Sequence, residues 1–444
     1  MKRILFLILA VLGFIINETE AQQIKSSGSS NSYDIGINSY LSYLMMEPNQ
    51  NLRKPNLLIN SKAEGLLPEK SLTLGFQMIG LANYQRATDD SKFGWLMRHP
   101  TPSNQIGTTV TEAVIHSAHL SLTASLNPWI TAYGELLFDP QQSFGPGTIT
   151  DLARNQVQLR KGMIMIGDLN KFPVYLAIGK MDTPFGQMGS VSPFTNSTMW
   201  HAFGGLAYSA ILGFDKYGIN ANVAFIQGGA QFRAANVPVD STAVPSRLNN
   251  LSLDLNYTLE VMDGIEVQVG GSYIKGSAYC QPWPVVHFMP CGEANPAYTY
   301  YGNIMIKNRL FLKASFAETL DIWPGTFNPA PPLNEFEASK VSSLDYGAIL
   351  NINPESDIVY SLSGEFSDFR AGPNGAPWER QNQLVLGFNA QIEETSRFFF
   401  EFFRAEGYVP LNFVSGGNFE NPGETHSRSD ANTTGFVLGV LMAI

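Results

Sequence analysis

Residues 341–366 read VSSLDYGAILNINPESDIVYSLSGEF and contain two alternating segments joined by a short turn at Asn353-Pro354. Side chains of a strand point alternately to its two faces. In Asp357–Phe366 the residues therefore separate into an apolar and a polar face. The apolar face is Ile358, Tyr360, Leu362 and Phe366, and the polar face is Ser361, Ser363 and Glu365. The segment also has the length of a tilted transmembrane strand, about 9–11 residues. This hairpin predicts a membrane β-barrel with one face toward lipid and the other toward the lumen.

The same pattern repeats from Ser71 to Ile444, and the connections alternate between short and long. We expect about sixteen strands, an even number as in outer-membrane barrels. The predicted fold class is all-β, a transmembrane antiparallel up-and-down barrel over residues 71–444 with short periplasmic turns and long extracellular loops. A soluble β-sandwich is the alternative, but it requires neither strands of membrane length nor strict alternation of loop lengths.

The N-terminus has the features of a secretory signal. Lys2 and Arg3 precede the apolar run Ile4–Ile16, and a cleavage site fits after Ala21. The run is too short to span a bilayer as a helix, which requires roughly 20 apolar residues. The sequence therefore predicts a signal peptide at residues 1–21, a lumenal or periplasmic segment at residues 22–70, and a barrel in a bacterial outer membrane. Outer-membrane lipid and the barrel assembly machinery are the expected partners, and a net charge of -10 without a basic patch argues against nucleic acid.

Charged side chains on the polar faces are candidates for lining the pore, because a charge in hydrocarbon would cost about 2–4 kcal/mol. Lys161 and Lys180 instead fall on apolar faces. A β-bulge near Lys161 would correct its facing, and Lys180 would snorkel or point into the barrel mouth. The predicted pore-lining residues are Glu135, Arg160, Asp254, Glu266, Lys313, Glu365, Arg397 and Glu401.

The connection Asp182–Phe203 is long, and Asp182 is its one formal charge. An external loop that faces water would carry more charge. We expect this loop, including Asp182 and Trp200, to fold into the lumen and narrow it. A loop that caps the rim or contacts a neighbouring subunit is the alternative, because loops also form interfaces.

The two cysteines, Cys280 and Cys291, are close in sequence, and in an exported chain they predict a disulfide; two free thiols are the alternative. His116 and His119 are three residues apart, which on a regular strand places them on opposite faces and prevents chelation of one ion. We therefore expect neither a metal nor a cofactor. No nucleophile elbow, phosphate loop or zinc helix occurs, so no enzymatic activity is expected, although a barrel lipase with distant Ser and His residues stays open.

The stretch Gly179–Gly186, GKMDTPFG, resembles a motif of ligand-uptake porins without a plug domain, and is most similar to the LbtU-type siderophore porin family. The resemblance implies a sixteen-stranded porin that passes a small ligand, an iron–siderophore complex, across the outer membrane. The siderophore would supply its own iron ligands. The alternatives are a general or ion-selective porin, and outside that class a barrel enzyme or surface adhesion protein. Ion selectivity and the choice between monomer and trimer stay open.

Overall fold

The structure is a computed structural model. It describes residues 33–47, 53–88, 108–138, 157–227, 248–280, 293–393, 395–409, 414–415 and 423–444. The chain divides into two units at Asp34, and the barrel belongs to the second, Ile35–Ile444. The predicted signal peptide at residues 1–21 lies outside the described residues and stays a prediction.

Strands dominate the second unit, and β14 begins one residue after the predicted segment Asp357–Phe366 and extends four residues beyond it. A short strand, β1, covers Asp34–Ile37 at the boundary of the two units. The barrel strands are β2 Ser71–Ala87, β3 Thr109–Ser125, β4 Ile130–Phe138, β5 Val157–Gly167, β6 Val174–Asp182, β7 Leu206–Lys216, β8 Ile219–Gln227, β9 Leu248–Met262, β10 Ile265–Ile274, β11 Ala297–Ile306, β12 Leu310–Thr319, β13 Ser342–Asn351, β14 Ile358–Arg370, β15 Arg380–Ile392, β16 Ser396–Tyr408 and β17 Arg428–Ala443.

Each of these strands pairs antiparallel with the next, and β17 pairs with β2, which closes the ring. The closing register joins Met442 to Met78 and Phe436 to Tyr84. Short turns and long connections alternate around the ring, so all short turns lie at one end of the barrel, which we call the short-turn end. The prediction of a closed sixteen-stranded up-and-down barrel is confirmed.

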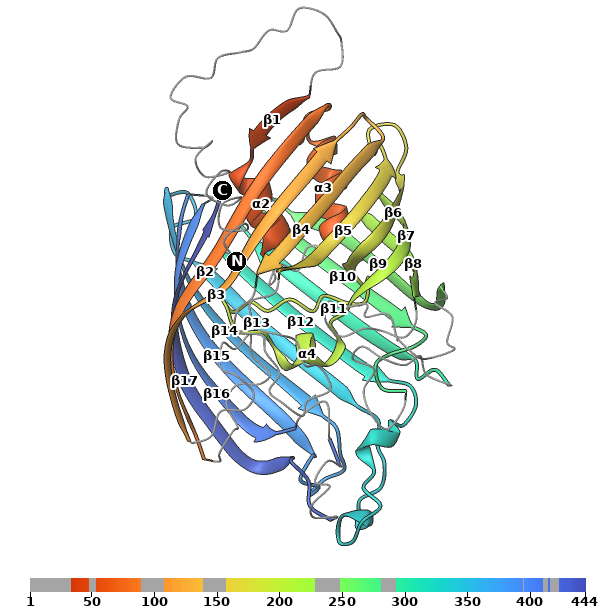
Figure 1. The fold of residues 1–444 in the computed structure, drawn as a ribbon, viewed down its shortest axis with the longest axis vertical. Coiled ribbons are helices and arrows are strands. Elements are labelled where there is room, and N and C mark those ends of the chain that lie inside the picture. The colour runs from red at the N-terminus through yellow and green to blue at the C-terminus, as the bar shows by residue number, and fades with distance from the viewer. Residues whose placement is uncertain are drawn as a thin grey trace, which may run out of the picture. The chain divides into compact units, whose positions relative to one another are not determined.

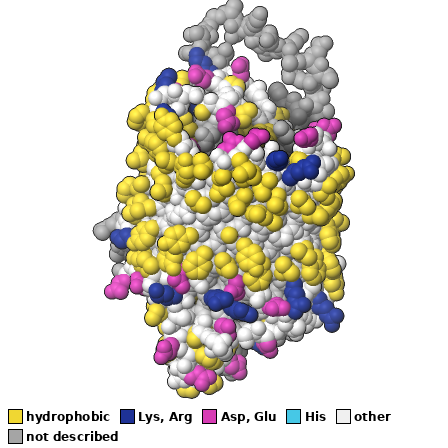
Figure 2. All heavy atoms as spheres, turned by 180° about the vertical axis from the view of Figure 1, so that it is seen from behind, with side chains coloured by type: hydrophobic (Ala, Val, Ile, Leu, Met, Phe, Trp, Pro, Cys, Tyr) yellow, Lys and Arg dark blue, Asp and Glu magenta, His cyan; other side chains and the backbone are white. Residues whose placement is uncertain are grey.

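The outer surface of the barrel is apolar over much of its height. Leu362 is 47% exposed, whereas Glu365, on the other face of β14, is 2% exposed. Figure 2 shows hydrophobic side chains in a band across one face of the molecule, with most charged side chains above and below it. This distribution matches a barrel that exposes an apolar belt to lipid. Within the described ranges, no helix is long and apolar enough to cross a membrane.

Two helices precede the barrel in the sequence and lie within its lumen. Helix α2 covers Ser39–Met46, and the Asn38 side chain caps its N-terminus by accepting from Leu41 N. Helix α3 covers Lys54–Ala63 and has a proline in its first turn. Helix α2 contacts β2, β3 and β17, and α3 contacts β5 and β6 (Figure 1). The Lys54 amine donates to the carbonyl oxygens of Leu44 and Glu47. It thereby provides hydrogen-bond donors for carbonyl groups at the C-terminal end of α2, which have no partner within the helix.

Irregularities in the strands change the facing of several residues. Between β4 and β5, Glu135 pairs with Lys161 and Leu136 with Leu159, so Arg160 is left out of the register. This confirms the predicted bulge: Leu159 is exposed, and Lys161 is buried with Met163. Lys180 does not snorkel to water; it is buried and donates to the Leu159 carbonyl oxygen at 2.7 Å.

The prediction that His116 and His119 lie on opposite faces is wrong. Ile79 pairs with Ser117 and Gly80 with Ile115, so His116 is the extra residue of a bulge in β3. Both histidines are buried inside the barrel. They still have different neighbours, because His116 packs on Phe194 and His119 contacts Glu135. In the part of the chain that the structure describes, no group of three or more metal-ligating side chains is found.

Candidate functional site: a loop and two helices in the lumen

The connection between β6 and β7, residues 183–205, enters the barrel, and we call it the inner loop. Most of its residues are buried and the others are half-buried, although it contains many serines and threonines. Its last part forms the short helix α4, Thr198–Phe203, whose cap is the Ser197 hydroxyl, which accepts from Trp200 N. Helix α4 contacts β12, β13, β14 and β15, on the far side of the ring from the loop's own strands (Figure 1). The loop therefore reaches across the lumen.

Carboxylates of the wall hold the backbone of the inner loop. Glu401, which is fully buried, accepts hydrogen bonds from Phe194 N at 2.5 Å, from Thr195 N at 3.1 Å and from the Thr195 hydroxyl at 2.6 Å. Glu365 accepts from Val191 N at 3.1 Å and from the Ser192 hydroxyl at 2.6 Å. Each of the two carboxyl groups accepts at least one backbone N–H and one hydroxyl of the loop, so these two side chains fix the loop's path.

Basic side chains of the wall hold carbonyl oxygens of the same loop. Lys313 donates to the Gly189 carbonyl oxygen and pairs with Asp345 at 2.5 Å. Arg397 donates to the Pro193 carbonyl oxygen at 2.9 Å. The wall thus offers acceptors to the loop's N–H groups and donors to its carbonyl groups, which is required of any buried irregular backbone.

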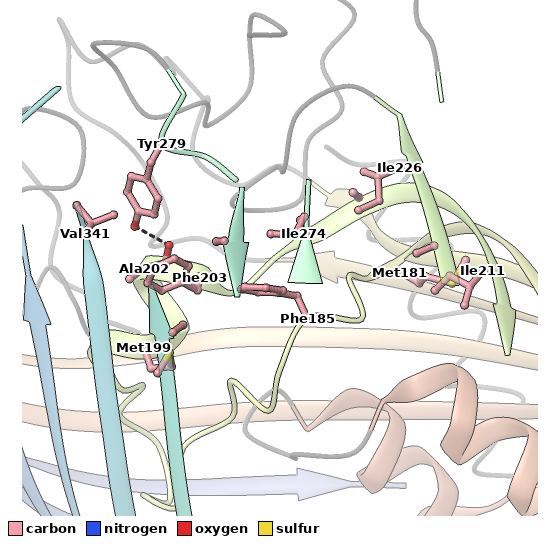
Figure 3. Close-up of a cluster of buried hydrophobic side chains, with 14 of the residues drawn as sticks. Met181, Phe185, Met199, Ala202, Phe203, Ile211, Ile226, Ile274, Tyr279 and Val341 are labelled. Carbon is pink, nitrogen blue, oxygen red and sulfur yellow. Dashed lines mark hydrogen bonds between the residues drawn. The ribbon is translucent and has the colours of Figure 1, made fainter. Parts of the chain in front are cut away.

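The end of the inner loop packs into an apolar cluster with the long connections (Figure 3). The Tyr279 hydroxyl donates to the Ala202 carbonyl oxygen at 2.6 Å, and the Tyr279 ring meets Phe203 at 5.4 Å and Trp323 at 4.9 Å between ring centroids. Burial raises the pKa of Tyr279 well above its ordinary value, which keeps its hydroxyl a donor. Tyr279 precedes Cys280, which is disulfide-bonded; Cys291 lies outside the described residues, so the predicted pairing stays a prediction.

Ion pairs fasten the two helices to distant points of the wall. Arg53, just before α3, pairs with Asp254 of β9, which also accepts from the Tyr301 hydroxyl at 2.8 Å. Although burial opposes it, the Asp254 carboxylate raises the pKa of Arg53 above its ordinary value. Glu47, at the end of α2, pairs with Arg397 of β16 at 2.6 Å. The carboxylates of both attachments are buried, and the two ion pairs lie on different parts of the wall, so they hold the helices in the lumen.

Two glycines of the barrel wall allow helix α2 and the inner loop to pack closely against it. A Cβ atom at Gly75 would lie 2.2 Å from the Ser42 hydroxyl oxygen of α2. At Gly387 it would lie 2.5 Å from Cδ of Pro193 in the inner loop. Both distances are far below van der Waals contact, so any larger residue would displace the helix or the loop.

A cavity of about 940 Å³ lies between the helices, the inner loop and the wall. Residues of the short turns contribute to its lining, among them Gly218, Gly264 and Lys307, so it reaches the short-turn end. Arg53, Asn56 and Asn60 line one side, and Gln187 and Pro193 of the inner loop line another. Polar side chains from β8, β9, β10, β11 and β15 complete it, namely Asn220, Asn256, Gln268, Asn303 and Asn389.

The predicted pore-lining residues divide into two groups. Glu266 and Arg397 line the cavity. The others have different positions. The helices or the inner loop are held by Asp254, Lys313, Glu365 and Glu401, while Glu135 accepts from the Tyr133 hydroxyl at 3.0 Å and contacts His119 at 2.8 Å. Asp182 pairs with Lys161 at 2.9 Å, and Arg160 and Trp200 are half-buried.

Sequence reasoning missed Glu47 and Arg53, which anchor the helices, and the cavity amides of β9 to β15. The amides carried a usable signal, because Asn256, Gln268 and Asn389 lie on the predicted polar faces of their strands. A search restricted to charged residues overlooked them.

No family model matches the chain. A curated relative, a "UPF0422 protein" of Coxiella burnetii, is 27% identical over 190 residues, which are 42% of this chain and 37% of the relative. The chain therefore spans well under half of the length of that relative.

Solved structures with a similar fold include the anion-selective porin from Comamonas acidovorans, which is 11% identical with a TM-score of 0.48, covering 84% of this chain and 99% of the porin. The outer membrane channel DcaP of Acinetobacter baumannii is 10% identical with a TM-score of 0.48, covering 84% of this chain and 97% of the channel. The OmpT outer membrane protein of Vibrio cholerae is 11% identical with a TM-score of 0.44, covering 84% and 98%.

Proposed function

We propose that this protein is an outer-membrane porin whose solute route is narrowed by the inner loop and by helices α2 and α3. The observation that supports it is a polar cavity of about 940 Å³ inside a closed barrel with an apolar outer surface. A ring of sixteen strands is wide enough to leave an aqueous channel. The inner loop and the helices each occupy part of that width, so passage would be selective by size.

The site residues of such a porin hold the lumenal segments in place or line the solute route, and they take part in no chemical reaction. Glu365, Glu401 and Lys313 would keep the inner loop in the lumen, and Arg397 and Glu266 would be met by a solute in the cavity. Export by a cleaved signal peptide, assembly by the barrel machinery and an outer-membrane lipid environment belong to this proposal. The resemblance at Gly179–Gly186 makes an iron–siderophore complex the first candidate ligand.

General diffusion of small solutes is the second candidate. It is favoured because most of the predicted pore charges are bound to the wall, to the loop or to the helices, and would not face a charged ligand.

Planar-bilayer recording of the purified full-length protein tests the porin function, and stable single-channel steps are expected. A correctly folded barrel that gives no steps and no swelling of liposomes in small sugars would contradict it. Growth on a ferric siderophore as the only iron source, with and without the gene, separates the two candidates: iron-dependent growth that needs the gene supports the siderophore, and equal growth supports general diffusion.

A further inference from the structure

The cavity has a chemistry of its own, and an inference about it rests on the proposed porin function. We propose that it is a binding site for a neutral solute rich in hydroxyl or amide groups, either a sugar or an uncharged ferric hydroxamate complex. Its volume of about 940 Å³ is near the upper end of ordinary small-ligand pockets, about 300–1,000 Å³. Three features of the lining determine the class of solute.

First, the arginines inside the cavity are already paired. Arg53 is bound to Asp254, and Arg397 is bound to Glu47. The carboxylate of Asp215 keeps its charge and accepts hydrogen bonds from three amides, those of Asn56, Asn60 and Asn220, at 3.0–3.3 Å. An anionic solute would lose its water here without gaining a free countercharge, and desolvation of an unpaired charge is expensive.

Second, carboxamides form a connected track on the wall. The Gln268 amide donates to the Asn256 side-chain oxygen at 3.2 Å and accepts from Asn303 at 3.2 Å, and Gln187 of the inner loop joins them by hydrogen bonds to Gln268 and Asn303. Each carboxamide presents both donors and acceptors. Such a surface complements hydroxyl and amide groups, which also do both.

Third, some polar atoms of the lining have no hydrogen-bond partner within the described part of the chain. They are the guanidinium Nε of Arg397, the side-chain oxygen of Asn389 and the side-chain oxygen of Asn303. Arg397 is 8% exposed. Buried polar atoms in proteins are nearly always paired with protein or water. One donor and two acceptors are thus left unpaired just behind the cavity surface, and a bound solute would reach them after a rotation of these side chains.

Charged groups do occur at the mouth, where Glu260, Glu266 and Lys307 line the cavity near the short turns. They would act on an approaching solute. The paired Arg53 and Arg397 and the carboxamides of the lining set the preference for neutral over anionic molecules.

Binding and conduction are measured separately. Equilibrium dialysis of the detergent-solubilised full-length protein uses maltose, a neutral ferric trihydroxamate and a ferric polycarboxylate, each alone and in competition. We expect saturable binding of maltose or of the trihydroxamate and no binding of the polycarboxylate. The neutral probe that binds more tightly shows whether the solute is a sugar or a ferric hydroxamate complex. Equal binding of the polycarboxylate, or binding of no probe, overturns the inference whether or not the barrel conducts.

Asn389→Leu removes one open acceptor while keeping the side-chain volume. It should weaken binding of the neutral probe by about two- to tenfold, the effect of one lost hydrogen bond. Asn389→Asp keeps the shape and adds a charge; it should weaken maltose binding and strengthen binding of glucosamine. The control is Asn382→Leu on the same strand, which does not line the cavity and should bind like the native protein.

In liposome swelling, glucose should enter faster than glucuronate, which has nearly the same size. A channel that passes both equally would contradict the inference and leave the porin function intact. A barrel that passes neither but binds maltose would contradict the porin function and leave the proposed binding site intact.

Discussion

The inner loop and the N-terminal helices both fill the lumen, but the wall holds them in different ways. The loop is joined to the wall at both ends, through β6 and β7, and side chains of the wall grip its backbone. The helices continue into the barrel only at β2, and contacts of their side chains hold most of their length. Besides the ion pairs of Arg53 and Glu47, Asn56 and Asn60 donate to Asp215, and Lys62 donates to the Asn127 carbonyl oxygen. Each of these contacts depends on one side chain of the helical segment, so a single substitution there removes it.

We therefore expect single substitutions to loosen the helices more readily than the loop. Arg397 lies where the two meet, because it donates to Glu47 of the helical segment and to the Pro193 carbonyl oxygen of the loop. Asp254 has a similar place: it binds Arg53 and accepts from the Ser272 hydroxyl at 2.5 Å, and that hydroxyl accepts from Gly186 N of the loop.

The largest effect on single-channel conductance is expected from deleting either the helical segment or the inner loop. Deletion of residues 38–66 should raise single-channel conductance by about two- to fourfold, since conductance follows the open cross-section of the pore. Deletion of residues 187–197 should also raise it, but should reduce the yield of folded barrel, because Glu365 and Glu401 then lose their partners. Heat-modifiable gel migration controls for folding. Unchanged conductance in a folded deletion variant would remove that segment from the solute route.

Matched carboxylate-to-amide changes test the two modes of attachment. Glu47→Gln should release the helices, because breaking a buried ion pair costs up to about 3–5 kcal/mol. Glu401→Gln leaves one oxygen for the loop and should cost about 1–3 kcal/mol. Hydrogen exchange should therefore accelerate over residues 39–63 in the first variant, and less strongly over residues 190–200 in the second. A larger acceleration over the inner loop in Glu401→Gln than over the helices in Glu47→Gln would mean that the loop is the more weakly held segment.

A pair of glycines on β2 tests how tightly α2 is held. Gly75→Ala places a methyl group against Ser42 and should destabilise the packed helix by about 1–3 kcal/mol. Gly80→Ala is the control, because its Cβ would lie at an ordinary 3.7 Å from Ile115. Faster hydrogen exchange in α2 is expected only for Gly75→Ala. Equal exchange in both variants would mean that α2 tolerates a shift at this point.

The smallest effect on the pore is expected from the disulfide. Cys280→Ser should leave barrel migration and conductance unchanged, because the bond closes a loop and does not join the strand ladder. Thiol labelling of the denatured, unreduced native protein should give no signal. Two reactive thiols would contradict the predicted pairing, and a fall in folded barrel in the variant would mean that the loop contributes to assembly.

Much of the barrel could be predicted from local pattern. Alternation in Asp357–Phe366 placed Leu362 outside and Glu365 inside, and the misplaced Lys161 correctly indicated a bulge. The same argument failed at His116. The bulge in β3 places no charged residue on the apolar face of the sequence pattern, so the pattern gives no sign of the bulge. The helices were not placed either, since a segment of polar and apolar residues fits the periplasm as well as the lumen.

The sequence by itself determined the approximate strand number and the facing of most side chains, because a period of two and the cost of charge in lipid act locally along the chain. It favoured an inward fold of the nearly uncharged connection but left a place at the rim open. Only the tertiary structure decided what each inward charge does. Glu401 faces inward by its place on the strand, but its role depends on Thr195, which lies 206 positions away in sequence. Pairing across a lumen is set by ring closure and by the path of the inner loop, and no periodicity in the chain encodes either.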